Sequence, residues 1–188
     1  MRSLHKYKFI LFASIMVLIL LTGCSNESPV STKVTELTQN IQNTEMNLIQ
    51  IEAGDYSSLL GTWTEIAYAE NLFDGTGTQW HVGARGTVPS TLSVSSDKIV
   101  LNDSAMIVQG NTLEDDAGSY LLSFTNNGSW LSADLADAST TINWSITFYP
   151  KGVVNDLEPN NDIQIDNSKD LIVIWYSGMQ VETVFEQE

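Results

Sequence analysis

From residue 47 onward, short apolar runs alternate with polar residues, and clusters of Gly, Asn, Asp and Ser separate the runs. Alternation with a period of two is typical of strands that bury one face. It is clearest where Ile142, Trp144, Ile146 and Phe148 are separated by single polar residues. The pattern predicts strands at residues 62–69, 78–82, 91–95, 98–102, 105–109, 120–125, 129–135, 141–149, 171–176 and 181–185.

Three dipeptides between these runs predict hairpin turns: Ser96-Asp97, Asn127-Gly128 and Ser177-Gly178. Residues 171–175 are apolar throughout, so we expect that strand to be covered on both faces. The strands are short, closely spaced and not interrupted by a long helical pattern, which predicts an all-β fold. An antiparallel, lipocalin-like barrel fits this meandering order best, and a β-sandwich is the alternative.

The N-terminal part has a different pattern, in which an apolar run at residues 9–21 follows a basic stretch with Arg2, Lys6 and Lys8. The apolar run has the length of the hydrophobic region of a secretory signal peptide. It falls short of the ~20 residues of a membrane-spanning helix. We therefore expect residues 1–23 to be a signal peptide.

The segment Leu21-Thr22-Gly23-Cys24 resembles the bacterial lipobox, which ends in a cysteine. The resemblance implies cleavage after Gly23 and a thioether-linked diacylglycerol on Cys24, which becomes the first residue of the mature protein. Two acyl chains anchor a protein to a membrane stably, whereas one chain does not. The alternative is an uncleaved N-terminal anchor with an incidental cysteine.

Residues 24–46 are rich in Ser, Thr, Asn and Gln and contain no aromatic residue. Such a segment buries too little apolar surface to offset its ordering entropy, so we interpret it as a flexible polar tether. A short helix around residues 32–42 is the alternative. The predicted organisation is a signal peptide (1–23), a tether (24–46) and an all-β domain (47–188).

The chain carries 8 Lys and Arg against 23 Asp and Glu, a formal net charge of -15. Phosphate binding requires clustered bases, so the composition excludes nucleic acid and anionic lipid surfaces as partners. We interpret the charge as a solubility feature, with a cationic partner as the alternative. Cys24 is the only cysteine, which excludes an intrachain disulfide and a multi-cysteine zinc site.

The sequence carries no recognisable catalytic motif, and we expect no catalytic residue, cofactor or metal. His81 is the only histidine after the leader, and its place in a strand pattern predicts an exposed polar position. Asp166, Ser168 and Asp170 have the spacing of the first ligands of a calcium loop, but the central Gly and final Glu are missing. A solvated turn is therefore predicted. The acidic clusters at residues 114–116 and 158–170 leave a carboxylate pair open.

The block Gly-Asp-Tyr-Ser-Ser-Leu-Leu-Gly-Thr-Trp, at residues 54–63, resembles that of an uncharacterised family of surface lipoproteins from low-GC Gram-positive bacteria. This resemblance brings no activity with it. Gly61-Thr62-Trp63 also resembles the Gly-x-Trp that opens the first strand of lipocalins. It implies a helical turn at residues 55–60, with Asp55 or Ser57 as its N-cap, and places Trp63 at the end of a barrel. The alternative is that Trp63 is an ordinary core aromatic.

These observations predict a lipoprotein anchored to the extracellular face of the cell membrane, with a non-enzymatic binding or interaction domain of unknown ligand. The first alternative is a lipocalin-like carrier of a small apolar ligand, which needs an interior cavity. The second is an envelope hydrolase with two opposed carboxylates, at least one of raised pKa. Trp80, Trp130 and Tyr176 are candidate aromatics of a binding face.

Overall fold

A computed structural model describes residues 45–188 except 138, 156, 158–162 and 164. The elements are two helices at the start, eleven strands, and one further 3-10 turn: α1 (Leu48–Glu52), the 3-10 turn η1 (Ser57–Leu59), β1 (Gly61–Asn71), β2 (Thr78–Val82), β3 (Thr91–Val94), β4 (Lys98–Leu101), η2 (Asn102–Ser104), β5 (Met106–Gln109), β6 (Thr112–Glu114), β7 (Ser119–Asn126), β8 (Leu131–Leu135), β9 (Trp144–Tyr149), β10 (Leu171–Tyr176) and β11 (Val181–Gln187).

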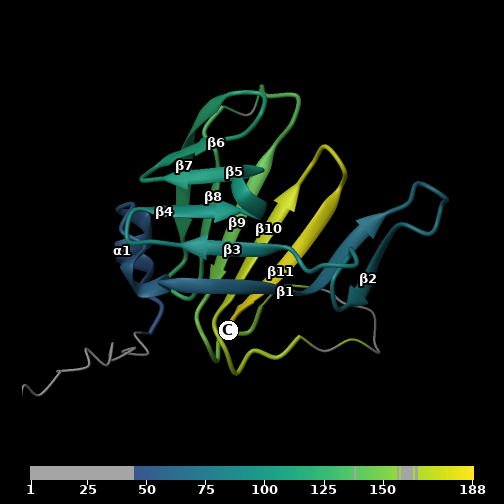
Figure 1. Cartoon of the computed structure of the whole chain (residues 1–188), viewed down its shortest axis with the longest axis horizontal. Coiled ribbons are helices and arrows are strands. Elements are labelled where there is room, and N and C mark those ends of the chain that lie inside the picture. Colours follow the sequence, from purple (N-terminus) through teal and green to yellow (C-terminus); the bar gives the residue numbers. More distant parts are fainter. Residues whose placement is uncertain (1–44, 138, 156, 158–162, 164) are drawn as a thin grey trace, which may run out of the picture. The chain divides into compact units, whose positions relative to one another are not determined.

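The strands form one antiparallel sheet that closes on itself (Figure 1). Each strand from β3 to β11 pairs with the next along the chain, and β1 closes the ring by pairing with both β3 and β11. β2 stands outside the ring and pairs only with the second half of β1. Closure removes the free edges that an open sheet exposes. The predicted all-β, lipocalin-like barrel is confirmed.

The predicted strand positions agree closely with the observed ones. β2 and β10 have the predicted bounds, and the other predicted strands begin and end within a few residues of the observed ones. The prediction missed the short strand β6, and it began β9 too early. Ile142 precedes β9 and is 36% exposed, so the buried alternation starts at Trp144.

The hairpin turns lie at the predicted dipeptides, but two of the three are centred one residue later than predicted. At Ser177-Gly178 the Gln180 N–H donates to the Ser177 carbonyl at 3.2 Å, so the central residues are Gly178 and Met179. Ser96-Asp97 is confirmed, because the Ser95 N–H donates to the Lys98 carbonyl across it at 2.8 Å. At Asn127-Gly128 the turn is centred one residue later. The Asn127 N–H donates to the Trp130 carbonyl, so the central residues are Gly128 and Ser129. Gly128 has a φ of 86°, and a positive φ at the first central residue is typical of a type II′ turn.

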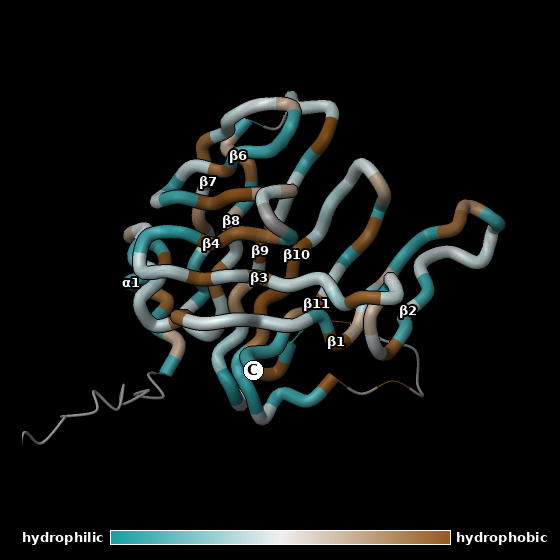
Figure 2. Tube along the Cα trace, in the orientation of Figure 1, coloured by the Kyte–Doolittle hydropathy of each residue, from teal (hydrophilic) through white to brown (hydrophobic). Residues whose placement is uncertain are grey.

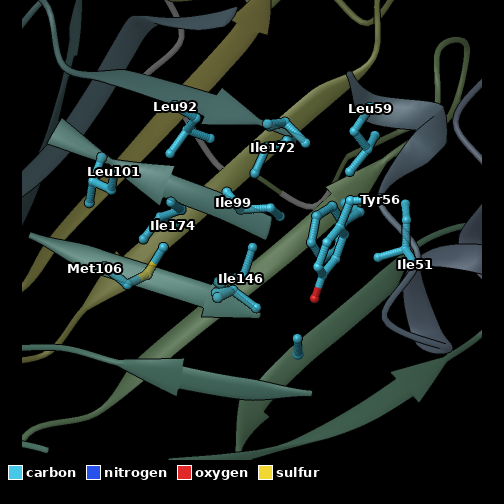
Figure 3. Close-up of a cluster of buried hydrophobic side chains, with 14 of the residues drawn as sticks. Ile51, Tyr56, Leu59, Leu92, Ile99, Leu101, Met106, Ile146, Ile172 and Ile174 are labelled. Atoms are coloured by element: carbon cyan, nitrogen blue, oxygen red, sulfur yellow. The ribbon is translucent and has the colours of Figure 1, made fainter. Parts of the chain in front are cut away.

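The interior of the barrel is filled by side chains from the inner face of the strands (Figure 3). Hydrophobic stretches lie along the strands, and hydrophilic ones gather in the turns (Figure 2). Trp63 is fully buried, and its indole N–H donates to the Leu59 carbonyl at 2.9 Å. Trp63 is therefore both a core aromatic and the residue that joins η1 to the barrel. Other interior side chains are Leu92, Ile99, Met106, Leu131, Ile146, Phe148, Ile172 and Phe185.

One end of the barrel, which we call the closed end, is covered by α1 and η1. The Asn47 side chain caps α1 by accepting the N–H groups of Ile49 and Gln50, and Ile51 is buried beneath the helix. Burial raises the pKa of the Tyr56 phenol far above its usual range, and the hydroxyl donates to the Gly110 carbonyl at 2.6 Å. The chain thus reaches the barrel at its closed end.

Two details of this end correct the sequence interpretation. Met46, which we placed in the tether, is buried in the barrel core. The N-cap position of η1 is occupied by Tyr56, although Asp55 does accept the backbone N–H and the hydroxyl of Ser57. These hydrogen bonds, the hydroxyl one first, lower the pKa of the Asp55 carboxyl.

Gly54 lies where two backbone segments meet, and the Cβ of an alanine would clash there. Its φ is +79°, and an added Cβ would lie 2.7 Å from the Gly110 Cα. We expect Gly54→Ala to lower the free energy of unfolding by about 2–4 kcal/mol, from backbone strain and overpacking. Gly110→Ala is the matched control, because its φ is +57° but the added Cβ meets nothing within 4 Å. Urea unfolding of both variants checks this, and equal losses would contradict it.

The wall formed by β1, β10 and β11 is also covered on its outer face. Leu171 and Val173 pack outward against Val184, while Ile172 and Ile174 point into the interior cluster. The outer cluster is completed by side chains of β1, β2 and the β9–β10 loop: Ala67, Ala69, Trp80, Val153, Leu157, Ile163 and Ile165. The prediction that residues 171–175 are covered on both faces holds for all of them except Trp175, which is partly exposed.

A β-bulge at Ile66 changes which face of β1 points inward. The register between β1 and β11 shifts between Glu65 and Ala67. Before the bulge, Trp63 and Glu65 face the interior; after it, Ala67 belongs to the outer cluster. Bulges bend a strand and increase its twist. After the bend, the second half of β1 stays paired with β11, and its other edge pairs with β2 in place of β3.

Candidate functional site

The end of the barrel opposite α1, which we call the mouth, holds a pocket of about 170 Å³. It lies where β4 and β10 end and where β9 and β11 begin. Its apolar wall consists of Leu101, Trp144, Ile174, Tyr176, Met179, Val181 and Phe185. Its polar groups come from Glu65, Arg85, Ser90, Asn102 and Thr183. One end of the barrel is therefore covered by α1 and η1, with an open hollow beside the helix lined by Leu48, Ile49 and Asn126. The other end presents the amphipathic pocket.

Glu65 is the buried carboxylate of this pocket, only 4% exposed. Its two oxygens accept the backbone N–H groups of Arg85 and Ser90, at 2.9 and 2.8 Å. One side chain on β1 thus holds both ends of the segment from Arg85 to Ser90 beside the mouth. Charge-assisted hydrogen bonds of this kind are roughly twice as strong as neutral ones.

The Arg85 side chain crosses the rim of the pocket. Its Nε donates to the Glu70 carboxylate at 3.0 Å, and Nη1 lies 3.8 Å from the Met179 sulfur. The guanidinium therefore connects the β2–β3 loop to β1 on one side and to the β10–β11 hairpin on the other. It remains 41% exposed, so its other donors face the solvent at the pocket opening.

The aromatic pair at the mouth is fixed from behind. The rings of Trp144 and Tyr176 pack with centroids 4.2 Å apart and a tilt of 33°. The Trp144 indole N–H donates to the Asp115 carboxylate at 2.9 Å. Asp115 also closes the β6–β7 turn by accepting the N–H groups of Ala117 and Gly118. This turn holds the indole in place, so the aromatic wall is preorganised.

A second, more open hollow continues from the pocket along β1. Tyr68, Glu70 and Val88 line it, and it shares Arg85 and Ser90 with the mouth pocket. Val88 and Met179, which line these hollows, are large exposed apolar side chains. Leu72 and Phe73 are also exposed, in the β1–β2 hairpin, which has a short hydrophobic stretch near its tip in Figure 2. Exposed apolar side chains that gather in one region are typical of interaction sites.

The three aromatic residues proposed from the sequence as a binding face do not lie together in the structure. Tyr176 lines the mouth pocket, as a binding-face residue would. Trp80 is buried in the outer cluster, and Trp130 packs against the same cluster beside Tyr149. The expectation that His81 is exposed is wrong, because Tyr68 stacks on its ring with centroids 4.7 Å apart and leaves it half-buried.

The acidic candidates are engaged in local turns. Asp166 accepts the N–H and hydroxyl of Ser168, whereas Asp170 accepts the Lys151 N–H. The predicted solvated turn matches this arrangement. Among the described residues, hydrogen bonds from a neighbouring Ser or Thr lower the pKa of four carboxyl groups, Asp55, Asp74, Asp137 and Asp166. A general acid requires a raised pKa. Of the acidic cluster 158–170, residues 158–162 and 164 lie outside the described residues.

The size of the mouth pocket bears on the carrier alternative. Pockets for small-molecule ligands usually enclose about 300–1,000 Å³, and most of this barrel's interior is occupied by its own side chains. The observed 170 Å³ admits a side chain or a small head group. The carrier of an apolar ligand is therefore the weaker hypothesis for this fold.

Sequence reasoning missed Glu65 and Arg85. One pattern does point to Glu65, since it alternates with Trp63 on a strand whose inward positions are otherwise apolar. No comparable sequence pattern marks Arg85, because the contacts that place it join residues far apart in the chain.

Cys24 and the predicted signal peptide and tether lie outside the described residues, apart from the last two tether positions. Within the described part of the chain, no helix is long and apolar enough to cross a membrane. In comparisons with protein-family models, curated proteins and solved structures, nothing matches this chain.

Proposed function

We propose that this protein is a lipoprotein anchored through Cys24 to the extracellular face of the cell membrane, and that it binds its ligand at the barrel mouth. The order of basic stretch, apolar run and Leu-Thr-Gly-Cys segment supports the anchor. The lipobox resemblance and the resemblance of residues 54–63 to a Gram-positive surface lipoprotein family support the same location.

The observation that carries the binding proposal is the difference between the two ends of the barrel. A chain coming from Cys24 reaches the barrel beside α1, where the end is covered and Glu45 pairs with Lys151. The amphipathic pocket and the exposed side chains of Val88 and Met179 are at the opposite end. A tether attached at the closed end leaves the mouth free to face away from the membrane.

The pocket favours an interaction module over a carrier or an enzyme. Its two charged groups already have partners: Glu65 accepts two backbone N–H groups, and Arg85 donates to the Glu70 carboxylate. A rigid, partly apolar pocket of this kind binds by shape and charge. Its limited volume fits a projecting group of a larger ligand.

Site-specific photo-crosslinking tests the proposal. Val88 at the mouth and Ile49 at the closed end are 78% and 77% exposed, so the pair differs in place and not in accessibility. A benzophenone amino acid is introduced at one position or the other, in the full chain, in intact cells. We expect crosslinked adducts from position 88 and few from position 49, measured on immunoblots. Equal adducts from both positions, or none from position 88, would contradict binding at the mouth.

A further inference from the structure

The walls of the mouth pocket have the chemistry that holds organic cations. Trp144 and Tyr176 form an aromatic pair with centroids 4.2 Å apart, and Met179 adds a polarisable thioether beside them. Aromatic faces attract ammonium and guanidinium groups through the ring quadrupole, and this attraction is strongest with tryptophan. The wall is fixed by the hydrogen bond from Trp144 to Asp115, so little ordering is needed on binding.

The charge at the mouth is negative. The Glu65 carboxylate lies in the pocket, the Asp115 carboxylate lies behind the Trp144 indole, and Glu70 is next to the rim. The lysines of the described part lie toward the closed end: Lys98 begins β4, Lys151 pairs with Glu45, and Lys169 pairs with Glu186. Like charges that line a cleft raise the local concentration of an oppositely charged ligand.

One cationic side chain of the protein itself, Arg85, lines the mouth pocket. The Arg85 guanidinium lies against the Met179 sulfur and is paired with Glu70. Its charge is therefore compensated by Glu70, whereas Glu65 is held only by neutral backbone N–H groups. The pocket keeps a net negative charge with Arg85 in place.

We propose that the mouth pocket binds an organic ammonium group. This inference rests on the proposed function and names the ligand chemistry of the same site. The ammonium belongs either to a lysine side chain of a partner protein or to a small free amine or quaternary ammonium compound. A volume of about 170 Å³ suits such a group with its first few methylenes.

The test follows ligand binding at Trp144. The full chain, labelled with 5-fluorotryptophan, is held in micelles of an uncharged maltoside detergent and observed by ¹⁹F NMR. The Trp144 signal is assigned by its loss in Trp144→Phe. The probes are tetramethylammonium, n-butylammonium, n-butyrate, and the peptide acetyl-Gly-Gly-Lys-Gly-Gly-amide. We expect the ammonium probes to shift the Trp144 signal to saturation, and butyrate to leave it unchanged.

The variant Arg85→Gln distinguishes a pocket that binds ammonium groups from one that binds anions through Arg85. The side chain is exposed and Glu65 binds the backbone N–H of residue 85, so the variant retains the loop contact. Removing a like charge next to the pocket is expected to raise the affinity for n-butylammonium about three- to tenfold. Lys98→Gln makes the same charge change at β4, away from the pocket, and is expected to leave the affinity unchanged.

The outcomes are distinct. Butyrate binding at Trp144, loss of n-butylammonium binding in Arg85→Gln, or no shift of Trp144 with any ammonium probe would each overturn the ammonium proposal. If the peptide binds at least about tenfold more tightly than n-butylammonium, a partner lysine is the source; equal affinity assigns a free amine. Crosslinking at position 88 with butyrate as the better probe keeps the proposed function and rejects the inference. Ammonium binding at Trp144 without crosslinking at position 88 keeps the ammonium site and rejects the proposed function.

Discussion

Replacing Trp63 with alanine is expected to lower the free energy of unfolding by about 3–5 kcal/mol, the usual cost of truncating a buried Trp. Trp63 is fully buried at the closed end, within the interior cluster. The surrounding strands are paired on both sides in a closed ring, which limits how far they can collapse into the cavity. The lost hydrogen bond also leaves the Leu59 carbonyl without its indole donor.

Trp63→Phe separates packing from hydrogen bonding, because it keeps most of the volume and loses the indole N–H. We expect it to cost about 1–2 kcal/mol. Guanidinium unfolding measured by circular dichroism gives both values. If Trp63→Ala cost less than about 1 kcal/mol, the closed end would not be packed as described.

Replacing Glu65 with alanine is expected to cost about 2–4 kcal/mol of stability, because two backbone N–H groups lose a buried acceptor. The donors are those of Arg85 and Ser90, so the β2–β3 loop is released at both ends. The effect should therefore extend beyond stability. Amide hydrogen exchange of residues 85 and 90 is expected to accelerate strongly, since these amides lose their protection.

Glu70→Ala is the matched control for Glu65→Ala. Glu70 lies on the same strand and pairs with the Arg85 side chain near the surface, where ion pairs contribute about 0–1 kcal/mol. We expect it to change stability little and to leave the exchange at residues 85 and 90 slow. Similar losses from the two variants would contradict the role given to Glu65.

The sequence predicted the fold well because most of the barrel is built from local signals. Strands such as β1 and β9 have a period-two pattern, and most consecutive strands pair, so local order and spatial order largely coincide. β6 was missed because Leu113 is its only apolar residue, which is too few to show a period. α1 was missed because its five residues are held by the Asn47 cap and the burial of Ile51, which are tertiary features.

The candidate site was much less predictable. Tyr176, a candidate binding aromatic, lines the pocket, but the other two aromatic candidates, Trp80 and Trp130, contact the outer cluster. What distinguishes the three is the face of the sheet that each one occupies. Arg85 is placed at the mouth by hydrogen bonds with Glu65 and Glu70, which lie 20 and 15 residues earlier in the chain. Contacts between residues so far apart leave no local sequence pattern.

The anchor on Cys24 is the claim on which the orientation of the whole protein depends, and the intact mass of the protein purified from cell membranes tests it most directly. The account predicts a chain of residues 24–188 that carries a diacylglycerol thioether on Cys24. A chain that begins at Met1 and keeps Cys24 as a free thiol would contradict it.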